Sequence, residues 1–176
     1  GAAYLAAHLA RAVARNPTSL LVGAGDLVGA SPLLSGLLHD EPTIEALNAM
    51  HLAVSAMGTH ELDEGQAELQ RMQGGGCHPV DGCRGSQPFA GARFQYLAAN
   101  VVRDDTRQTL LPPTAIVTVG GVKLGLIGET LQRTPSVVAV TSTRGLTFLD
   151  EASTANRYAA QLKAQGAQAV VLLIHE

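Results

Sequence analysis

Residues 52–63 read LAVSAMGTHELD, and the pattern of this stretch is the starting point for predicting the fold. Its first six residues form a short apolar run that Gly58 ends, which is the pattern of a buried β-strand. Polar groups follow at once, because His60 lies three residues before Asp63, whose carboxylate can reach the imidazole ring. A carboxylate that orients an imidazole suits proton donation or oxyanion stabilisation. The alternative is a turn in which the two side chains merely bond each other.

Two more short apolar runs end in the same way. Residues 20–22 are bounded by glycine and lead to Asp26, and residues 169–174 lead directly to His175. The chemistry of α/β sheets usually lies at the carboxyl ends of parallel strands. We therefore expect Asp26, His60 and His175 to cluster at one sheet edge. Taken singly, Asp26 could be a turn or cap residue and His175 a satisfied polar residue.

The remaining segments alternate between helical and strand patterns. Helices are indicated by apolar residues at three- and four-residue steps and by capping residues. They are expected over residues 1–15, after a cap at Asp40 or Glu41, over residues 64–73, and over residues 151–165, opened by Asp150 or Ser153. Further strands are expected over residues 94–102, 114–119, 122–127 and around Phe148, with Gly120-Gly121 as a hairpin turn. Residues 74–93 are expected to be irregular, and the whole order predicts a mixed α/β sheet covered by helices.

The composition excludes several classes of function. The chain has 176 residues, of which 46% are hydrophobic and 15% charged, so it can build a sizeable core. Its formal net charge is -3, and its Lys and Arg residues form no run, so a nucleic-acid polymer is not expected as a partner. No apolar run reaches the roughly 18 residues of a membrane span. No signal peptide is visible in the sequence.

A small cysteine cluster leaves three interpretations open. Cys77 and Cys83 flank His78 in a glycine-rich loop. A local disulfide is the expectation for an exported protein, and it would stabilise the fold by roughly 2 kcal/mol. A zinc site of Cys77, His78 and Cys83 has only three ligands at an unusual spacing, and a pair of reduced cysteines is the third interpretation. The histidines that lie in or at the ends of helices are interpreted as surface or structural, and they are His8, His39 and His51.

In their order and spacing, these motifs resemble the calcineurin-like metallophosphoesterases, and in particular their 5′-nucleotidase branch. That branch carries Ser-Ala-Gly-Asp, then Gly-Asn-His-Glu-Phe-Asp-x-Gly, then a strand that ends in His-Glu-Gly. This chain carries Gly23-Ala24-Gly25-Asp26, then GTHELDEG at residues 58–65, then Leu173-Ile174-His175-Glu176. The segment EPTIEA at residues 41–46 and the Gly120-Gly121 hairpin are similar too, so the resemblance covers essentially the whole chain.

The resemblance implies a fold and a role for each site residue. The fold would be a mixed β-sheet sandwich flanked by helices, in αββα layers. The reaction would be hydrolysis of phosphomonoesters, such as nucleoside 5′-monophosphates, with two divalent metal ions (Zn, Mn or similar). Asp26 would bridge the two metals, His175 would bind one, and His60, oriented by Asp63, would stabilise or protonate the phosphate. Thr59 stands where the family has a metal-binding Asn, and its shorter hydroxyl is expected to be a weak ligand.

Two motifs of the family, Asp-x-His and Gly-His-x-His, do not occur in residues 1–176. We therefore expect this chain to be a partial metallophosphatase domain that binds few or no metals and has little activity alone. The resemblance also implies a downstream substrate-recognition domain and a periplasmic or extracellular location. The alternative is a catalytically silent module that keeps the fold for binding or structure, which Thr59 favours. A third interpretation is an α/β domain with no history of metal binding.

Overall fold

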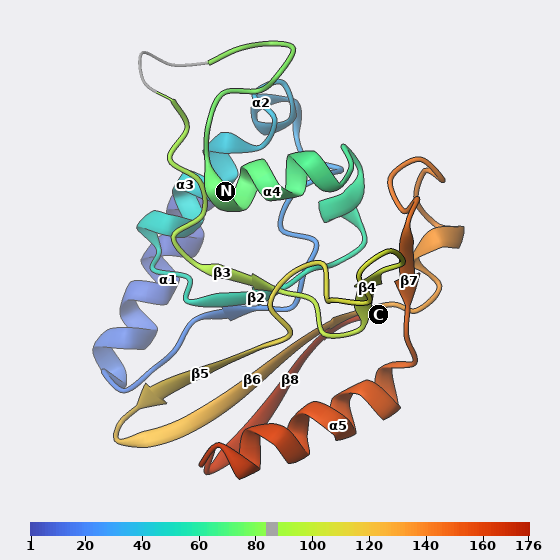
Figure 1. Cartoon of the computed structure of the whole chain (residues 1–176). Coiled ribbons are helices and arrows are strands. Elements are labelled where there is room, and N and C mark those ends of the chain that lie inside the picture. The colour runs from blue at the N-terminus through green and yellow to red at the C-terminus, as the bar shows by residue number, and fades with distance from the viewer. Residues whose placement is uncertain (84–87) are drawn as a thin grey trace.

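Two three-stranded sheets pack against each other, with helices on the outer side of each (Figure 1). This computed structural model describes residues 1–83 and 88–176. The first sheet is parallel throughout and has the order β1 (Val22–Gly23), β2 (Val54–Ala56), β3 (Gln95–Leu97). In the second sheet, β6 (Val122–Thr130) lies between antiparallel β5 (Thr114–Val119) and parallel β8 (Ala169–His175).

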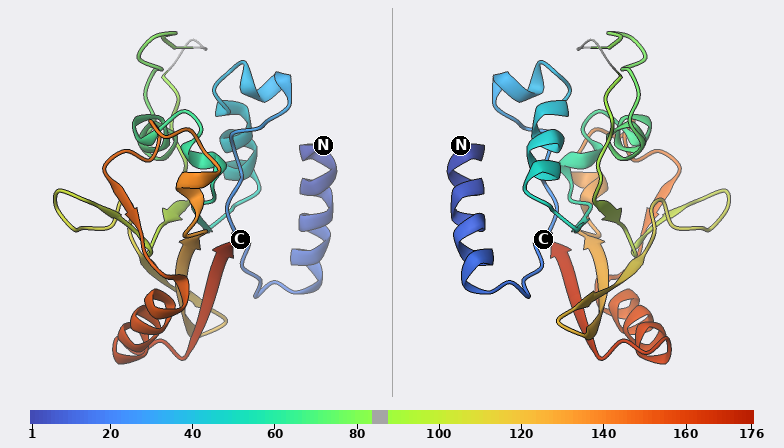
Figure 2. Two further views of the ribbon diagram at one scale, coloured as in Figure 1. Left: turned by 90° about the vertical axis from the view of Figure 1, so that its right-hand side faces the viewer. Right: turned by 90° about the vertical axis from the view of Figure 1, so that its left-hand side faces the viewer.

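The other elements surround or connect these sheets, and Figure 2 shows α1 standing to one side of them. The α-helices are α1 (Ala2–Arg15), α2 (Leu33–Gly36), α3 (Glu41–Ala49), α4 (Gln66–Gly74) and α5 (Glu151–Ala164). Two single 3₁₀ turns, η1 (His60–Leu62) and η2 (Thr134–Ser136), and an antiparallel pair, β4 (Val101–Arg103) with β7 (Leu146–Phe148), complete the described parts. Within residues 1–83 and 88–176, no helix is both long and apolar enough to cross a membrane.

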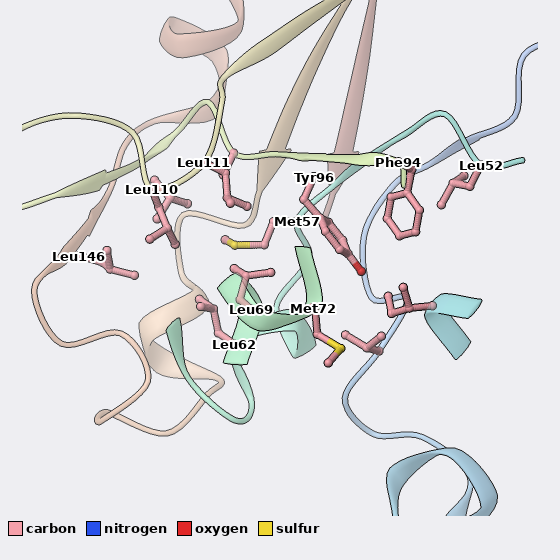
Figure 3. Close-up of a cluster of buried hydrophobic side chains, with 14 of the residues drawn as sticks. Leu52, Met57, Leu62, Leu69, Met72, Phe94, Tyr96, Leu110, Leu111 and Leu146 are labelled. Carbon is pink, nitrogen blue, oxygen red and sulfur yellow. The ribbon is translucent and has the colours of Figure 1, made fainter. Parts of the chain in front are cut away.

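Buried apolar side chains form three clusters between the layers. The first joins α3 and α4 to the parallel sheet, and Figure 3 shows Leu69 beside Leu62 and Met57, with Met72 below Tyr96. The second lies between the two sheets, and the third packs α5 on the outer face of β6. Each sheet has one face on the other sheet and one face on helices. The central strand β2 is buried throughout, whereas β5 and β8 at the edges of the second sheet keep exposed residues. The αββα sandwich is therefore confirmed.

Most of the predicted elements are confirmed, with small shifts at their ends. The helices expected at residues 1–15, after Asp40, at residues 64–73 and at residues 151–165 correspond to α1, α3, α4 and α5. The hairpin at Gly120-Gly121 joins β5 to β6, and both glycines have positive φ. Asp150 caps α5 by accepting the Ser153 N–H. The prediction that residues 74–93 are irregular falls partly on residues 84–87, which lie outside the described residues.

The expected mixed arrangement of strands is divided between two sheets, since β1–β3 and β5–β6–β8 share no ladder among the described residues. Two predictions from the pattern are wrong. Residues 94–102 are not one strand, because the N–H of Ala99 turns away from the first sheet to the Gly128 carbonyl of β6, at 2.7 Å. Asp40 precedes α3 but its side chain makes no cap there; its Oδ2 accepts the Gly29 N–H instead, at 2.9 Å. Long-range partners override the local signal in both cases.

Gly128 lies where the two sheets approach each other closely, and it provides a stability test. A β-carbon at this position would collide with the Leu97 side chain and with its carbonyl oxygen. We expect Gly128→Ala to lower the free energy of unfolding by about 1–3 kcal/mol, because the packed backbones cannot separate without losing contacts. Gly74→Ala is the matched control, since nothing lies within 4 Å of its added carbon. Urea unfolding measures both, and equal stability of the two variants would contradict the sheet packing described.

Candidate active site

Sharp turns follow β1 and β2 and bring the two strand ends together. Gly25 and Asp26 both have positive φ, of +94° and +52°, a conformation that glycine adopts freely and Asp only at a cost. A side chain on Gly58 would collide with the Asp26 backbone and carboxylate, and one on Gly25 would meet the Gly58 backbone. The approach of the two turns therefore requires glycine at both positions.

The buried carboxylate of Glu61 fastens these turns to each other. Its Oε2 accepts the N–H groups of Asp26 at 2.9 Å and Gly58 at 2.6 Å, and its Oε1 accepts the N–H of Leu27 at 2.7 Å. Burial raises the pKa of Glu61 to about 7, against the opposing effect of these three donors. The local sequence indicates no role for Glu61, because two of its partners lie 34 and 35 residues away in the chain.

The Asp26 carboxylate lies where the three expected strand ends meet. Its Oδ1 accepts the backbone N–H of His60 at 2.9 Å. Its Oδ2 lies 2.9 Å from Nε2 of His175 and 4.0 Å from Nε2 of His60. The Thr59 hydroxyl donates to the same carboxylate at 3.3 Å. The structure thus brings Asp26, Thr59, His60 and His175 together at the carboxyl ends of β1, β2 and β8.

His60 and Asp63 form a pair at the edge of this site. His60 Nδ1 lies 2.7 Å from Asp63 Oδ2, within the single turn η1 and the residue that follows it. The hydrogen bond to Asp63 raises the pKa of His60 above its ordinary value, although burial opposes the rise. Since Nδ1 faces Asp63, the other ring nitrogen is the one that can meet a ligand. The side chain of His60 is 43% exposed, so a ligand has access to it.

A second support for the site comes from Asp40, another residue whose role the sequence did not indicate. Its bond to the Gly29 N–H holds the segment after Asp26 against His60, because a β-carbon on Gly29 would collide with the His60 side chain. That segment also borders a surface hollow, whose lining residues are Asp26, Leu27, Val28, Ala30, Ser31, Pro32 and His60. A ligand in this hollow would therefore touch both the carboxylate and the imidazole.

The donors around Asp26 fit part of a divalent metal site. One carboxylate oxygen and the His175 imidazole face each other, and carboxylate oxygen and imidazole nitrogen are ligands of Zn²⁺ and Mn²⁺. The Thr59 hydroxyl is the third polar group on this carboxylate. Among the described residues, no third His, Asp, Glu or Cys donor closes the set around Asp26 and His175 within 4.8 Å. The residues present would hold one cation incompletely, and a second cation needs further ligands.

Glu61→Gln tests the link between the turns. An amide offers one acceptor oxygen instead of two and sets its NH₂ against a backbone N–H, so we expect the free energy of unfolding to fall by about 1–3 kcal/mol. The raised carboxyl pKa means that the folded chain binds more protons than the unfolded chain between pH 4.5 and about 7. The contribution of Glu61 to stability therefore falls as pH rises through that window, and Gln abolishes this dependence.

The matched control is Glu45→Gln, an exposed glutamate on α3 that should change neither quantity. Chemical unfolding at several pH values between 4.5 and 8 measures both effects. A Glu61→Gln variant as stable as the control at every pH would show that the carboxylate does not hold the turns.

Three curated proteins each match this chain over a small part of their own length. The chain is 37% identical over 172 residues to Endonuclease YhcR of Bacillus subtilis, covering 98% of the chain and 14% of that protein. It is 36% identical to Cell wall protein Lmo0130 of Listeria monocytogenes, covering 99% and 24%. It is 28% identical to the 2′,3′-cyclic-nucleotide 2′-phosphodiesterase/3′-nucleotidase of Salmonella typhimurium, covering 96% and 26%. No protein-family model matches the chain.

Two solved structures superpose on nearly the whole of this chain. The 5′-nucleotidase precursor from Thermus thermophilus superposes with a TM-score of 0.78 at 27% identity, over 97% of this chain and 30% of that one. The calcineurin-like phosphoesterase YfkN from Bacillus subtilis has a TM-score of 0.76, and its 22% identity supports the fold alone; the match covers 97% of this chain and 52% of that one. With the motifs at Asp26, residues 58–63 and His175 in place, the chain belongs to the calcineurin-like metallophosphoesterase superfamily, in its 5′-nucleotidase branch.

Proposed function

We propose that the longer protein to which this chain belongs hydrolyses phosphomonoesters, with nucleoside 5′-monophosphates as the substrate class. The observation that carries the proposal is the convergence on Asp26, where one carboxylate faces the His175 imidazole beside the His60–Asp63 pair. Nucleotides are named as substrates of the 3′-nucleotidase and 5′-nucleotidase relatives. A carboxylate and an imidazole that can hold a cation, beside an oriented acid, are groups that metal-assisted phosphoester hydrolysis uses.

Asp26, His175 and Thr59 are the residues that would hold divalent cations here. Such cations, when bound, supply charge stabilisation for a phosphoryl group and a nucleophilic water at neutral pH. Asp26 is suited to hold them because its backbone is locked by Glu61, so the carboxylate is positioned before any ligand arrives. Thr59 is the weakest of the three, since its hydroxyl already donates to Asp26.

His60 is the residue proposed to act directly on the phosphate. Asp63 holds the ring through Nδ1 and raises the pKa of the imidazole, which keeps His60 protonated to higher pH. Its Nε2 can then donate to a phosphate oxygen or to the leaving oxygen of the ester. Asp63 acts through the ring and touches no substrate.

The rest of the catalytic machinery is proposed to lie elsewhere in the longer protein. The chain spans only 14% to 26% of the three curated relatives described, and its cation ligands are incomplete. We propose that residues 1–176 are part of a metallophosphatase domain, that a separate domain recognises the nucleotide, and that the chain alone has little activity. A periplasmic or extracellular location agrees with the cell wall relative and with a disulfide between Cys77 and Cys83.

A catalytically silent binding module is the second candidate. Thr59 favours it, because this hydroxyl occupies the family's metal-binding Asn position while bonding Asp26 itself. The domain would be catalytically inactive if other residues of the site had also lost their catalytic roles. The Glu61 links and the His60–Asp63 pair argue for the enzyme, since both are fully formed.

Asp63→Asn tests the role of the aspartate. Without the carboxylate, the pKa of His60 should fall toward its ordinary value of 6.5. The pair stabilises the fold fully below pH 6.5, and this contribution is lost as pH rises through the raised pKa of folded His60. The destabilisation caused by Asp63→Asn should therefore be largest at low pH. An NMR titration of the imidazole signals measures the pKa, with Asp105→Asn as an exposed control; an unchanged His60 titration would refute the pairing.

Thr59→Asn in the longer protein separates the enzyme from the silent module. An amide oxygen reaches further than a hydroxyl, so metal occupancy should rise and phosphate release from a nucleoside 5′-monophosphate should increase by roughly 10–100-fold. Titration with Mn²⁺ or Zn²⁺ and a phosphate assay measure the two effects, and Thr106→Asn at an exposed position is the control. Equal occupancy and equal rates would show that Thr59 serves the site as it is. No phosphate release by either protein would reject the proposed function itself.

A further inference from the structure

A second surface hollow, of about 560 Å³, lies between α5 and the turn that follows β4. Its lining residues are 107–112 together with Val102, Leu149, Arg157 and Tyr158, and none of them lines the hollow beside Asp26. In both views of Figure 2, α5 lies on the side of the sheets opposite α1. Small-molecule sites usually have volumes of roughly 300–1,000 Å³. The hollow is therefore large enough to be a binding site of its own.

Two arginines, Arg107 and Arg157, give this hollow a positive charge. None of its lining residues is Asp or Glu. Across residues 1–83 and 88–176, no carboxylate lies within 4.0 Å of either guanidinium, whereas Arg71 is bound by two glutamates. Arg157 lies over the ring of Tyr158, 4.8 Å from its centroid, a contact that supports the guanidinium and leaves its N–H donors unused. Both arginines can therefore donate to an anion from solution.

Acidic residues close to the hollow do not cancel this charge. On the turn itself, Asp104 accepts the Thr147 hydroxyl at 2.6 Å, and Asp105 accepts the N–H of the next residue at 2.7 Å. The charge of Arg157 acts on the buried carboxyl group of Glu129, but burial is the larger effect and raises the pKa of Glu129 to about 7. Much of the negative charge of Glu129 is therefore absent at neutral pH.

Backbone hydrogen bonds hold the turn that carries Arg107. The N–H of Arg103 donates to the Gln108 carbonyl at 2.8 Å, and the N–H of Arg107 donates to the Arg103 carbonyl at 2.9 Å. The N–H of Asp104 donates to the Gly145 carbonyl at 2.9 Å, which ties the turn to the segment before β7. Arg107 has a φ of +58°, a conformation that is rare for a residue with a side chain. Because this wall is already formed, little ordering opposes the binding of a ligand.

The rest of the hollow is largely apolar. Val102, Leu110 and Leu111 are buried, and Leu149 and Tyr158 are half-buried beside them. A ligand in the hollow would meet guanidinium groups together with apolar and aromatic side chains. This combination suits an anionic group on an organic body better than it suits a bare inorganic ion.

We propose that this hollow binds a small phosphomonoester, with its phosphate on Arg107 and Arg157 and its organic part on the apolar side chains. A guanidinium is a planar fork of N–H donors that can bond two oxygens of a phosphate or carboxylate. Two guanidiniums match the charge of a phosphomonoester dianion, whereas one is sufficient for a carboxylate. No bond is made or broken at this site. Binding requires neither Asp26 nor His60, so it is independent of the proposed phosphoesterase activity.

Calorimetric titration of the metal-free chain with phenyl phosphate tests this proposal. We expect one molecule per chain, and weaker binding of inorganic phosphate, which lacks an organic part, and of benzoate, which carries a single charge. Arg107→Gln and, separately, Arg157→Gln should each weaken phenyl phosphate binding roughly 10–100-fold, because each removes hydrogen bonds between charged groups. The matched control is Arg11→Gln, an exposed arginine on α1, which should change nothing.

His60→Ala separates this site from the candidate active site and should leave phenyl phosphate binding unchanged. If thermal denaturation shows that Arg157→Gln is unfolded, Arg157→Lys replaces it; lysine keeps the charge but not the fork, so binding should still weaken. The proposal is overturned if phenyl phosphate does not bind, if either arginine variant binds it as tightly as Arg11→Gln, or if His60→Ala abolishes binding. Equally tight binding of inorganic phosphate or benzoate also overturns it. Activity is not measured, so these outcomes leave the proposed phosphoesterase function untouched.

Discussion

The Glu61 carboxylate is the contact on which the candidate site depends. It accepts backbone N–H groups from the turn after β1 and from the turn after β2, and so joins two strands at their functional ends. Without a partner of this kind, the left-handed backbone of Asp26 would be a costly conformation on an unsupported turn. With it, Asp26 is held against His60 and His175. Because this arrangement buries the Glu61 carboxyl group, the pKa of Glu61 is raised.

The sheets determine why residues so distant in sequence meet at this point. β1 and β2 are parallel neighbours in one sheet, while β8 belongs to the other, and the two sheets pack closely where Gly128 faces Leu97. Asp26 and His175 therefore come from different layers and meet at a shared edge. Because Asp26 and His175 come from different sheets, a small displacement of one sheet relative to the other would separate the carboxylate from the imidazole.

Much of this could be predicted from local sequence. Apolar runs followed by Asp26, His60 and His175 indicated their common edge, and the three-residue spacing of His60 and Asp63 indicated their pair. Residues whose partners are set by the fold could not be predicted: Glu61 and Asp40 look like ordinary turn and cap residues until the chain folds back on them. The break between β3 and β4 was missed for the same reason, since Ala99 bonds to a strand 29 residues later.

Amide hydrogen exchange of the metal-free chain tests whether Glu61 joins the two turns, because it reports on each of the three hydrogen bonds to Glu61 separately. We expect the N–H groups of Asp26, Leu27 and Gly58 to be protected to a similar degree and to open together, although they lie in loops. We also expect Glu61→Gln to remove this shared protection while that of β6 is retained. Exchange of these amides at the rate of an unstructured loop, or protection that survives Glu61→Gln, would show that Glu61 does not join the turns.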